Sequence, residues 1–507
     1  MATLSPQFGS IVPSPIQLPN PNNYLAFDAG ANDFAQQYLP EIYEQEVERY
    51  GNRTLSGFLR MVGAEMPMTS DQVIWSEQNR LHISYDNCGI AADQGGGAAN
   101  SSIVKLGGGA TAINVISVND TIVMLDPVSG AEAKGIVIAT VAGAGGVGGA
   151  GGAQITVRSF ANATFAAQGM TISVANALGS IKVFVYGSDY TKGTTTTGAL
   201  GAGVGNSAAR ISATPAFTQF SNSPVIIRDQ YVVSGSDMAQ IGWVEVTTEN
   251  GATGYLWYLK SEHETRLRFD DYLETSMLEA VPAVTNSGAA TELGNAAVAN
   301  TGAGSEGVFY VVNNRGNVWS GGNPNVLGDF DSIIQRLDKQ GSIEENVIFV
   351  DRQFGFDIDD MLAAQNSYGA GGTSYGLFDN DQEMALNLGF TGFRRGYDFY
   401  KSDWKYLNDP TMRGGLPQGS GSGRINGLLV PAGSTSVYDQ ILGKNAKRPF
   451  LHVRYRASET EDRRYKTWIT GSAGGAQTSS LDAMEVNFLS ERAVCTLGAN
   501  NFFLFQE

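Results

Sequence analysis

Two clusters of carboxylate side chains are the groups in this chain that could most directly do chemistry. They occur in the segments FDIDD at 356–360 and DNDQE at 379–383. Neighbouring carboxylates can bind a hard cation or act as general acid and base, so a carboxylate-based hydrolase using Asp357 to Asp360 is one hypothesis. Neither segment has the spacing of an EF-hand loop, and a lone acidic cluster is more often a solvated turn or the start of a helix.

A glycine pattern of the dinucleotide-binding kind, GxGxxG, occurs at Gly143, Gly145 and Gly148. In a nucleotide site such a pattern is followed by a helix whose N-terminus meets the pyrophosphate, and an acidic residue binds the ribose about 20 residues later. Here a strand-like segment, 154–160, follows, and no Asp or Glu lies between Glu132 and Asp189. The pattern therefore favours a glycine-rich hairpin loop over a nucleotide site.

Histidine and cysteine residues form no pattern typical of a metal site or a nucleophile. His82, His263 and His452 are isolated in the sequence, and Cys88 and Cys495 lie far apart. No HExxH, CxxC, Walker A, nucleophile-elbow or kinase motif is present. The sequence therefore predicts no enzyme activity, no metal and no cofactor, and its few cysteines suit folding in a reducing compartment.

One basic zone stands out in an otherwise acidic chain. Its members are Lys444, Lys447, Arg448, Arg454, Arg456, Arg463, Arg464 and Lys466. Arg454 and Arg456 are two residues apart, so on a strand they share one face and could meet phosphates or acidic neighbours. Salt bridges between protein surfaces are the more ordinary expectation for such a zone.

Composition excludes several classes of protein. The chain has 507 residues, enough for two to four domains, and 33 basic against 50 acidic residues give a net charge of −17, which argues against broad DNA binding. The uncharged stretch 135–155 is rich in Gly and Ala rather than Leu or Phe, so a membrane span is not expected. The N-terminal segment has no basic start and no continuous apolar run, so no signal peptide is expected.

The first half of the chain reads as an arm, short helices and a β-rich unit. Residues 1–34 are rich in Pro and nearly uncharged, which indicates an extended arm, and 40–62 read as two short helices. Residues 71–90 alternate as a strand. Six strands are expected in a small barrel or sandwich, at 113–118, 121–126, 135–141, 154–160, 170–174 and 181–187. Glycine-rich flanks on both sides mark this unit as an insertion.

A long amphipathic helix is predicted from Gly254 to Val281, closed by Pro282. Apolar residues recur along it close to the helical period, with His263 on the core side: Leu256, Leu259, Leu267, Phe269, Leu273, Met277 and Val281. On its charged face, Glu262 with Arg266 and Glu264 with Arg268 are i,i+4 pairs. The remainder mixes strands, expected at 308–312, 346–350, 427–430, 450–455 and 502–505, with helices at 329–340, 379–388 and 434–443. The fold class is therefore α+β.

The amino-acid sequences of several segments resemble those of a known protein family. ERYGNRTLSGFLR at 48–60, VIWSEQNRLH at 73–82, PVIIRDQYVVSGSD at 224–237, the long helix and FLHVRYRAS at 450–458 are similar to the major capsid proteins of crAss-like gut phages. These proteins have the Hong Kong 97 type capsid fold of tailed phages. The resemblance is weakest over 95–210.

The resemblance implies a division of the chain into capsid-subunit parts. These are an extended N-terminal arm at 1–40, short helices at 41–66, an extended loop at 67–110 and 190–250 with an inserted β domain at 111–189, a peripheral domain at 251–305 and 431–507 carrying the long spine helix, and an axial domain at 306–430. Residues 74–83 and 225–233 would form the two arms of the extended loop.

It also implies a function in assembly. The expected role is a major capsid protein that forms hexamers and pentamers of an icosahedral head around double-stranded DNA, without sequence-specific DNA binding and without a membrane. Portal and auxiliary or decoration proteins are the expected partners, and the virion, assembled in the host bacterial cytoplasm, is the expected location. The expected interface residues are Glu262, Glu264, Arg266, Arg268, Asp270, Trp75, Arg80, Arg228, Arg454 and Arg456.

Two other functions stay open at this point. A different virion component, such as a tail or fibre subunit, would show sequence repeats and fewer helices. A carboxylate-based hydrolase would lose its activity on Asp359→Asn.

Overall fold

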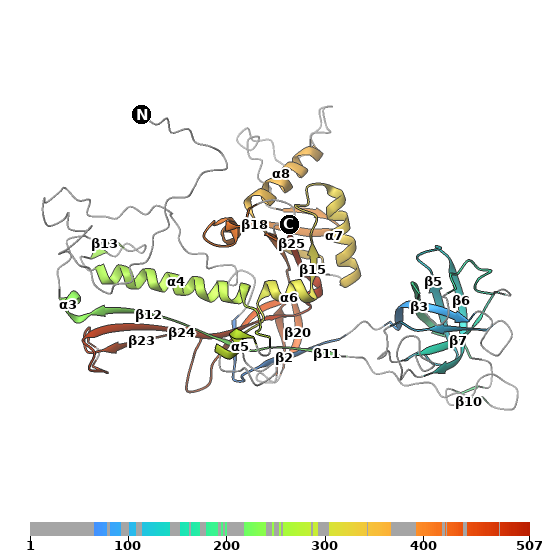
Figure 1. Ribbon diagram of the computed structural model, residues 1–507, viewed down its shortest axis with the longest axis horizontal. Coiled ribbons are helices and arrows are strands. Elements are labelled where there is room, and N and C mark those ends of the chain that lie inside the picture. The colour runs from blue at the N-terminus through green and yellow to red at the C-terminus, as the bar shows by residue number, and fades with distance from the viewer. Residues whose placement is uncertain are drawn as a thin grey trace. The chain divides into compact units, whose positions relative to one another are not determined.

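A computed structural model describes residues 65–78, 82–92, 101–107, 114–141, 153–161, 164–172, 179–190, 194–195, 198–199, 217–239, 246–247, 253–254, 257–284, 287–292, 304–341, 343–366, 392–417, 421, 423–439, 444–475 and 477–507. The chain divides into unit 1, Met1–Trp75 with Phe220–Glu507, and unit 2, Ser76–Gln219 (Figure 1). The predicted arm at 1–40 and the short helices at 41–66 lie outside the described residues, except Glu65 and Met66, which belong to a strand.

A five-stranded sheet in unit 1 is built around one long strand. β24 (Ala483–Thr496) pairs with β12 (Val225–Ser234) from Ala483 to Arg492, and its other edge is shared by β22 (Leu451–Arg456) and β23 (Lys466–Gly471). β1 (Glu65–Met68) joins β22 in parallel at the edge of the sheet. The second loop arm predicted at 225–233 is therefore wrong, because those residues pair with β24. Alternation of apolar residues predicts a strand but not which strand it pairs with.

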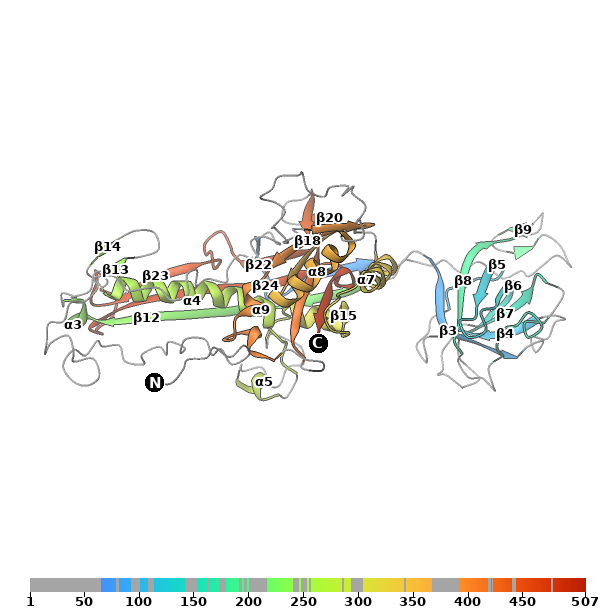
Figure 2. The same ribbon diagram turned by 90° about the horizontal axis from the view of Figure 1, so that it is seen from above.

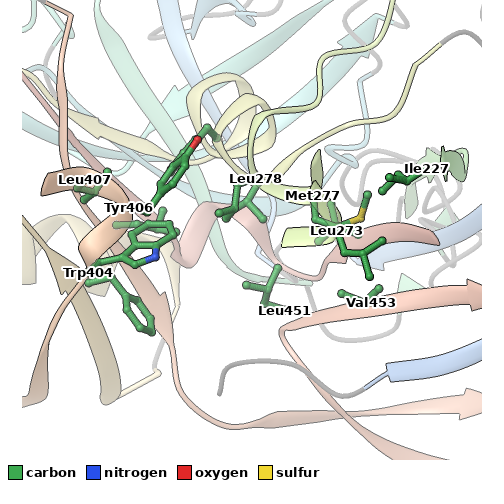
Figure 3. Close-up of a cluster of buried hydrophobic side chains, with 14 of the residues drawn as sticks. Ile227, Leu273, Met277, Leu278, Trp404, Tyr406, Leu407, Leu451 and Val453 are labelled. Atoms are coloured by element: carbon green, nitrogen blue, oxygen red, sulfur yellow. The ribbon is translucent and has the colours of Figure 1, made fainter. Parts of the chain in front are cut away.

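The long helix α4 (Trp257–Glu279) lies along β12 and β24 in both views (Figures 1 and 2). Phe269, Leu273 and Met277 recur every four residues and are fully or almost fully buried, so this stripe fixes which face of the helix meets the sheet. Figure 3 shows Leu273 and Met277 near Ile227 of β12 and Val453 of β22. The helix continues without a break through 260–264, as predicted.

The predicted bounds and stripe of this helix need three corrections. Gly254 is not helical but pairs with Val246 in a small hairpin, β13 (Val246–Thr247) and β14 (Thr253–Gly254). Leu267 is only half-buried, because it lies beside the stripe that Phe269, Leu273 and Met277 form, and Val281 lies past the helix end and is exposed. Leu256 and the side chain of Leu259 lie outside the described residues.

A six-stranded mixed sheet forms the rest of the core of unit 1. Its order is β15 (Asn317–Trp319), β25 (Phe503–Gln506), β19 (Ile425–Pro431), β16 (Glu345–Val350), β18 (Tyr397–Asp403) and β17 (Gly392–Arg395). One face, with Ile348 and Phe399, packs on α7 (Leu327–Gln340) and α8 (Arg352–Asn366). The other face, with Leu428 and Leu504, belongs to the same cluster as Phe269 and Met277 of α4. The two sheets of unit 1 therefore share one hydrophobic core.

Two segments of unit 1 have the opposite secondary structure to the one predicted. Residues 308–312, expected as a strand, form the start of helix α6 (Val308–Arg315), which buries Val308, Phe309, Val311 and Val312. A short apolar run does not distinguish a buried strand from a buried helix. Residues 434–443, expected as a helix, contain β20 (Ser434–Asp439), which pairs with β21 (Lys444–Pro449). The helix expected at 379–388 lies outside the described residues.

Shorter elements complete unit 1. They are helices α3 (Gly235–Met238), α5 (Gly288–Glu292) and α9 (Lys405–Asn408), and the 3-10 turns η3 (Arg413–Gly415) and η4 (Ala499–Asn501). A two-stranded sheet pairs β2 (Val73–Gln78) with β11 (Phe217–Asn222), the two strands by which the chain leaves and re-enters unit 1. We call this pair the ribbon.

Unit 2 contains a closed six-stranded barrel (Figure 2). Its strands, in order around the barrel, are β3 (Ser84–Ala92), β4 (Ser101–Lys105), β7 (Gln154–Ser159), β6 (Glu132–Val141), β5 (Asp120–Leu125) and β8 (Ile181–Ser188). Alternate residues such as Ile90, Ile122, Val157 and Val183 point inward and are buried. A two-stranded hairpin, β9 (Thr194–Thr195) with β10 (Gly198–Ala199), follows in the chain.

The barrel takes two of its strands from outside the predicted β unit. Residues 114–118 and 170–171, expected within strands, are irregular, and their places are filled by β3 and β4 from 84–105. Asp126 shows why the segment near 170 folds as it does. Its buried carboxylate accepts the backbone N–H of Thr171 at 2.8 Å and that of Val128 at 2.9 Å, which fixes two turns. Burial alone would raise the pKa of Asp126, but these hydrogen bonds outweigh it and hold the pKa well below its usual range.

Candidate assembly surfaces

The charged side of α4 is partly engaged inside the chain. Arg268 is exposed and binds Asp229 of β12, with Nε 3.0 Å from one carboxylate oxygen and Nη2 3.2 Å from the other. The guanidinium of Arg266 lies 5.9 Å from the ring centre of Tyr465. Burial, and then the charge of Asp270, raise the pKa of Tyr465 to about 12. Arg266, Arg268 and Asp270 therefore help to dock α4 on its own sheet.

Glu262 and Glu264 lie on the first half of α4 and are half-buried. We expected all five charged residues of this face to be available to a neighbouring subunit. Arg268 differs from that expectation, because it already has the ion-pair partner Asp229. A charge reversal at Arg268 would act first within the chain, through that contact. Sequence spacing suggested Glu264 as the partner of Arg268, and the partner Asp229 lies 39 residues away.

The sheet face opposite α4 carries a separate group of side chains, of which Ile226 and Arg228 are exposed and Lys466 and Trp468 are half-buried. Arg228 alternates with the core residue Ile227 and so points away from α4, and its guanidinium lies 6.0 Å from the ring of Trp468 on β23. Lys466 approaches the same ring at 5.8 Å. Ile226, two residues before Arg228 and therefore on the same face of β12, is 54% exposed. We call Ile226, Arg228, Lys466 and Trp468 the outer sheet patch.

Arg454 and Arg456 share one face of β22, as their spacing predicted, and both contact β1 or its neighbouring loop. Arg454 donates from Nη1 to the carbonyl of Pro67 at 3.3 Å. Arg456 binds Asp71, and its Nη1 also lies 3.2 Å from Glu491. These arginines therefore hold the edge strand β1 on the sheet.

Arg456 and three further members of the basic zone are paired with carboxylates of the same chain. Arg463 lies 2.7 Å from Glu491, Arg464 binds Glu65, and Lys466 binds Glu461. Buried Arg492 lies 3.4 Å from Glu65. No local pattern signals the roles of Glu65, Glu491 and Arg492, because their partners are up to 427 residues away. These pairs are intramolecular salt bridges, so Arg456, Arg463, Arg464 and Lys466 favour neither phosphate binding nor a salt bridge between subunits. The side chains of Lys444 and Lys447 lie outside the described residues.

Trp75 stands at the base of the ribbon. Its ring centre lies 6.3 Å from that of Phe220 on β11, and the guanidinium of Arg315 lies 5.9 Å from the Trp75 ring. Arg80 lies outside the described residues, so its predicted interface role is untested. Phe220 and Arg315 were not identified from the sequence, and no motif marks them.

The groups that suggested chemistry have structural roles in the described part of the chain. Asp357 accepts the side-chain N–H groups of Asn323 at 2.7 Å and Gln353 at 3.0 Å, and Asp359 binds Lys401 at 2.6 Å. The second cluster, 379–383, lies outside the described residues. Among the residues described, no group of three or more His, Cys, Asp or Glu is placed to hold a metal ion.

The glycine pattern, the histidines and the cysteines give no site either. Residues 143–148 lie outside the described residues, but they connect β6 to β7, which pair antiparallel from Val141 and Gln154, as in a hairpin. Cys88 and Cys495 are free and buried, and burial raises their pKa values to about 11 and about 12. His263 is half-buried, and burial lowers the pKa of His452 to about 4. None of the described helices is long and apolar enough to span a membrane.

No protein-family model matches this chain, and no curated protein matches it. Solved structures that are similar to it include a chain from Microbacterium phage Oxtober96, with 11% identity and a TM-score of 0.32 over 63% of this chain and 80% of that chain. The mature capsid of bacteriophage PhiM1 matches with 9% identity and a TM-score of 0.29 over 63% and 79%. The SrpI encapsulin complex of Synechococcus elongatus PCC 7942 matches with 11% identity and a TM-score of 0.29 over 58% and 77%.

Proposed function

We propose that this chain is the major capsid protein of a crAss-like tailed phage, a subunit of the Hong Kong 97 type that assembles with copies of itself into hexamers and pentamers of a closed shell. The observation that carries the proposal is the architecture of unit 1. A helix of 23 residues lies on a sheet with a central strand of 14 residues, and this layer shares one core with a second, mixed sheet. The resemblance in the sequence implies a peripheral domain that carries a long spine helix, together with an axial domain.

The ribbon and the outer sheet patch support a role in assembly. A two-stranded ribbon without a core of its own is marginally stable in water unless other protein covers it. Ile74 of β2 is 58% exposed, and Ile226 in the outer sheet patch is 54% exposed. Contact with neighbouring copies would bury both. In this proposal the ribbon acts as the extended loop, and unit 2 is its inserted domain.

The net negative charge of the chain is compatible with a shell that encloses DNA. A strongly acidic protein repels the phosphate backbone, so a shell whose subunits each carry a net charge of −17 would enclose double-stranded DNA without binding it tightly. Portal and decoration proteins are proposed partners, and assembly in the host cytoplasm with incorporation into the virion is the proposed setting. The hydrolase alternative gains no support, because Asp359, its test residue, is paired with Lys401.

Charge reversal in the outer sheet patch tests the proposal. Arg228→Glu should leave the free energy of unfolding within about 0.5 kcal/mol of the parent, because Arg228 is exposed. It should nevertheless lower the yield of assembled particles in sedimentation, because an acidic partner surface would now be repelled. Lys134→Glu in the barrel, also exposed, is the matched control and should assemble normally. Normal assembly of Arg228→Glu would remove the outer sheet patch from the interface.

A further inference from the structure

Asn222, the last residue of β11, makes an unusually complete set of hydrogen bonds for one buried side chain. It is only 4% exposed. Its Nδ2 donates to the carbonyls of Glu306 at 2.9 Å and Val494 at 2.8 Å. Its Oδ1 accepts from the N–H groups of Ser223 and Glu306, both at 2.9 Å, and from the hydroxyl of Ser305 at 3.0 Å. One amide thus ties the end of the ribbon to β24 and to the segment before α6.

Arg315, on α6, packs its guanidinium against the aromatic side chains of the ribbon. Its guanidinium carbon lies 4.3 Å from the ring centre of Phe220 on β11 and 5.9 Å from that of Trp75 on β2. Its Nη2 lies 2.7 Å from a carboxylate oxygen of Glu306. One guanidinium therefore contacts both strands of the ribbon.

Glu306 connects these two sets of contacts. Its backbone N–H and carbonyl are both bound by Asn222, and its carboxylate is bound by Arg315. Asn222 therefore acts on the ribbon both directly and through the placement of Glu306 and Arg315. Farther along β2, alternate residues are exposed, with a burial pattern that offers no core to order the strand.

We propose that Asn222 is a positioning residue that fixes the root of the β2–β11 ribbon on unit 1 through Glu306 and Arg315, so that the ribbon leaves unit 1 as a pre-ordered arm. This inference deepens the proposed function and rests on it where the arm serves assembly. Pre-ordering matters because each side chain that must be immobilised on binding costs affinity.

Hydrogen–deuterium exchange on the dilute full-length chain tests the proposal without assembly. Asn222→Ala should speed amide exchange in peptides covering 73–78 and 217–222 by about tenfold or more, with peptides of the barrel and of α4 unchanged. Asn222→Asp, which sets a carboxylate oxygen against the two carbonyl oxygens of Glu306 and Val494, should speed exchange at least as much. Asn317→Ala is the matched control, because Asn317 is also buried and donates to two carbonyls, those of Asn500 and Phe502.

A second pair of variants covers the case in which Asn222→Ala fails to fold. Arg315→Lys should also speed exchange in the ribbon, because a lysine cannot bind Glu306 and stack on two rings at once. Arg413→Lys is its control, since Arg413 likewise binds a carboxylate, that of Glu279, and lies over a ring, that of Phe309. Unchanged exchange in the ribbon of Arg315→Lys and of any folded Asn222 variant, or equal increases in both controls, would overturn the proposal. Assembly is scored separately, so a parent chain that forms no shells would refute the proposed function and leave this test intact.

Discussion

At the residue scale, His452 is a buried base that the fold keeps neutral. It is 3% exposed, its Nδ1 lies 3.1 Å from the carbonyl of Pro449, and Cys495 is its register partner on β24. Burial, and then the positive charge of Arg454, lower its pKa from about 6.5 to about 4. Because its pKa is lower in the folded chain, the unfolded chain binds the extra proton between these two values.

His452 should therefore make stability depend on pH in a defined window. Its contribution is fully present above pH about 6.5 and is lost as the pH falls towards about 4, at up to about 1.4 kcal/mol per pH unit. His452→Gln should flatten the pH dependence of the unfolding free energy in that window, measured by urea denaturation. His82→Gln, at an exposed position, is the control and should leave the slope unchanged. Equal slopes in the parent and in His452→Gln would contradict the assignment.

At the element scale, α4 depends on the aromatic contacts of its buried stripe. Phe269 is fully buried, with its ring centre 5.4 Å from that of Tyr465 and 5.6 Å from that of Phe488. Phe269→Ala should cost about 3–5 kcal/mol of unfolding free energy, because it leaves a cavity between helix and sheet. Leu267→Ala should cost less than Phe269→Ala, and Tyr272→Ala, at a 44% exposed position, should cost least. Chemical denaturation ranks the three variants, and a Leu267→Ala cost equal to that of Phe269→Ala would contradict this packing.

The same elements show which features a sequence pattern can predict and which it cannot. Periodicity over more than twenty residues placed α4 to within three residues, since a long pattern leaves little choice of structure. The prediction of a strand at 308–312 is wrong, because five apolar residues in a row are compatible with either a buried helix or a buried strand, and here they begin α6. Pairings such as Arg268 with Asp229, or β3 with β8, join segments far apart in the chain. No local pattern specifies them, so most of the candidate interface residues could be named but not their partners.

At the scale of the whole molecule, the two units differ in charge. Unit 2, Ser76–Gln219, balances seven acidic residues against seven basic ones, so the net charge of −17 resides in unit 1. The acidic residues are Glu77, Asp86, Asp93, Asp120, Asp126, Glu132 and Asp189, and the basic ones are Arg80, Lys105, Lys134, Arg158, Lys182, Lys192 and Arg210. In the proposed shell, repulsion of DNA would therefore come from unit 1 alone.

The barrel should fold by itself only when all six strands are present. A fragment of residues 82–190 contains every strand of the closed barrel, whereas 111–187 lacks β3 and β4 and leaves the neighbouring strands β7 and β8 as open edges. The longer fragment should give a β-type circular dichroism spectrum and a cooperative thermal transition. The shorter one should aggregate or remain unfolded. A folded, monomeric 111–187 fragment would contradict the closure seen here.

Electron microscopy of the purified full-length chain, negatively stained, tests the central claim most directly. A capsid subunit should form closed, hollow particles of uniform size, or rings of five and six copies, as the concentration rises. Arg228→Glu, imaged beside it, should show fewer of them, and Lys134→Glu should match the parent. Particles confined to single copies or to one small oligomer at every concentration would contradict the proposal that this chain builds a shell.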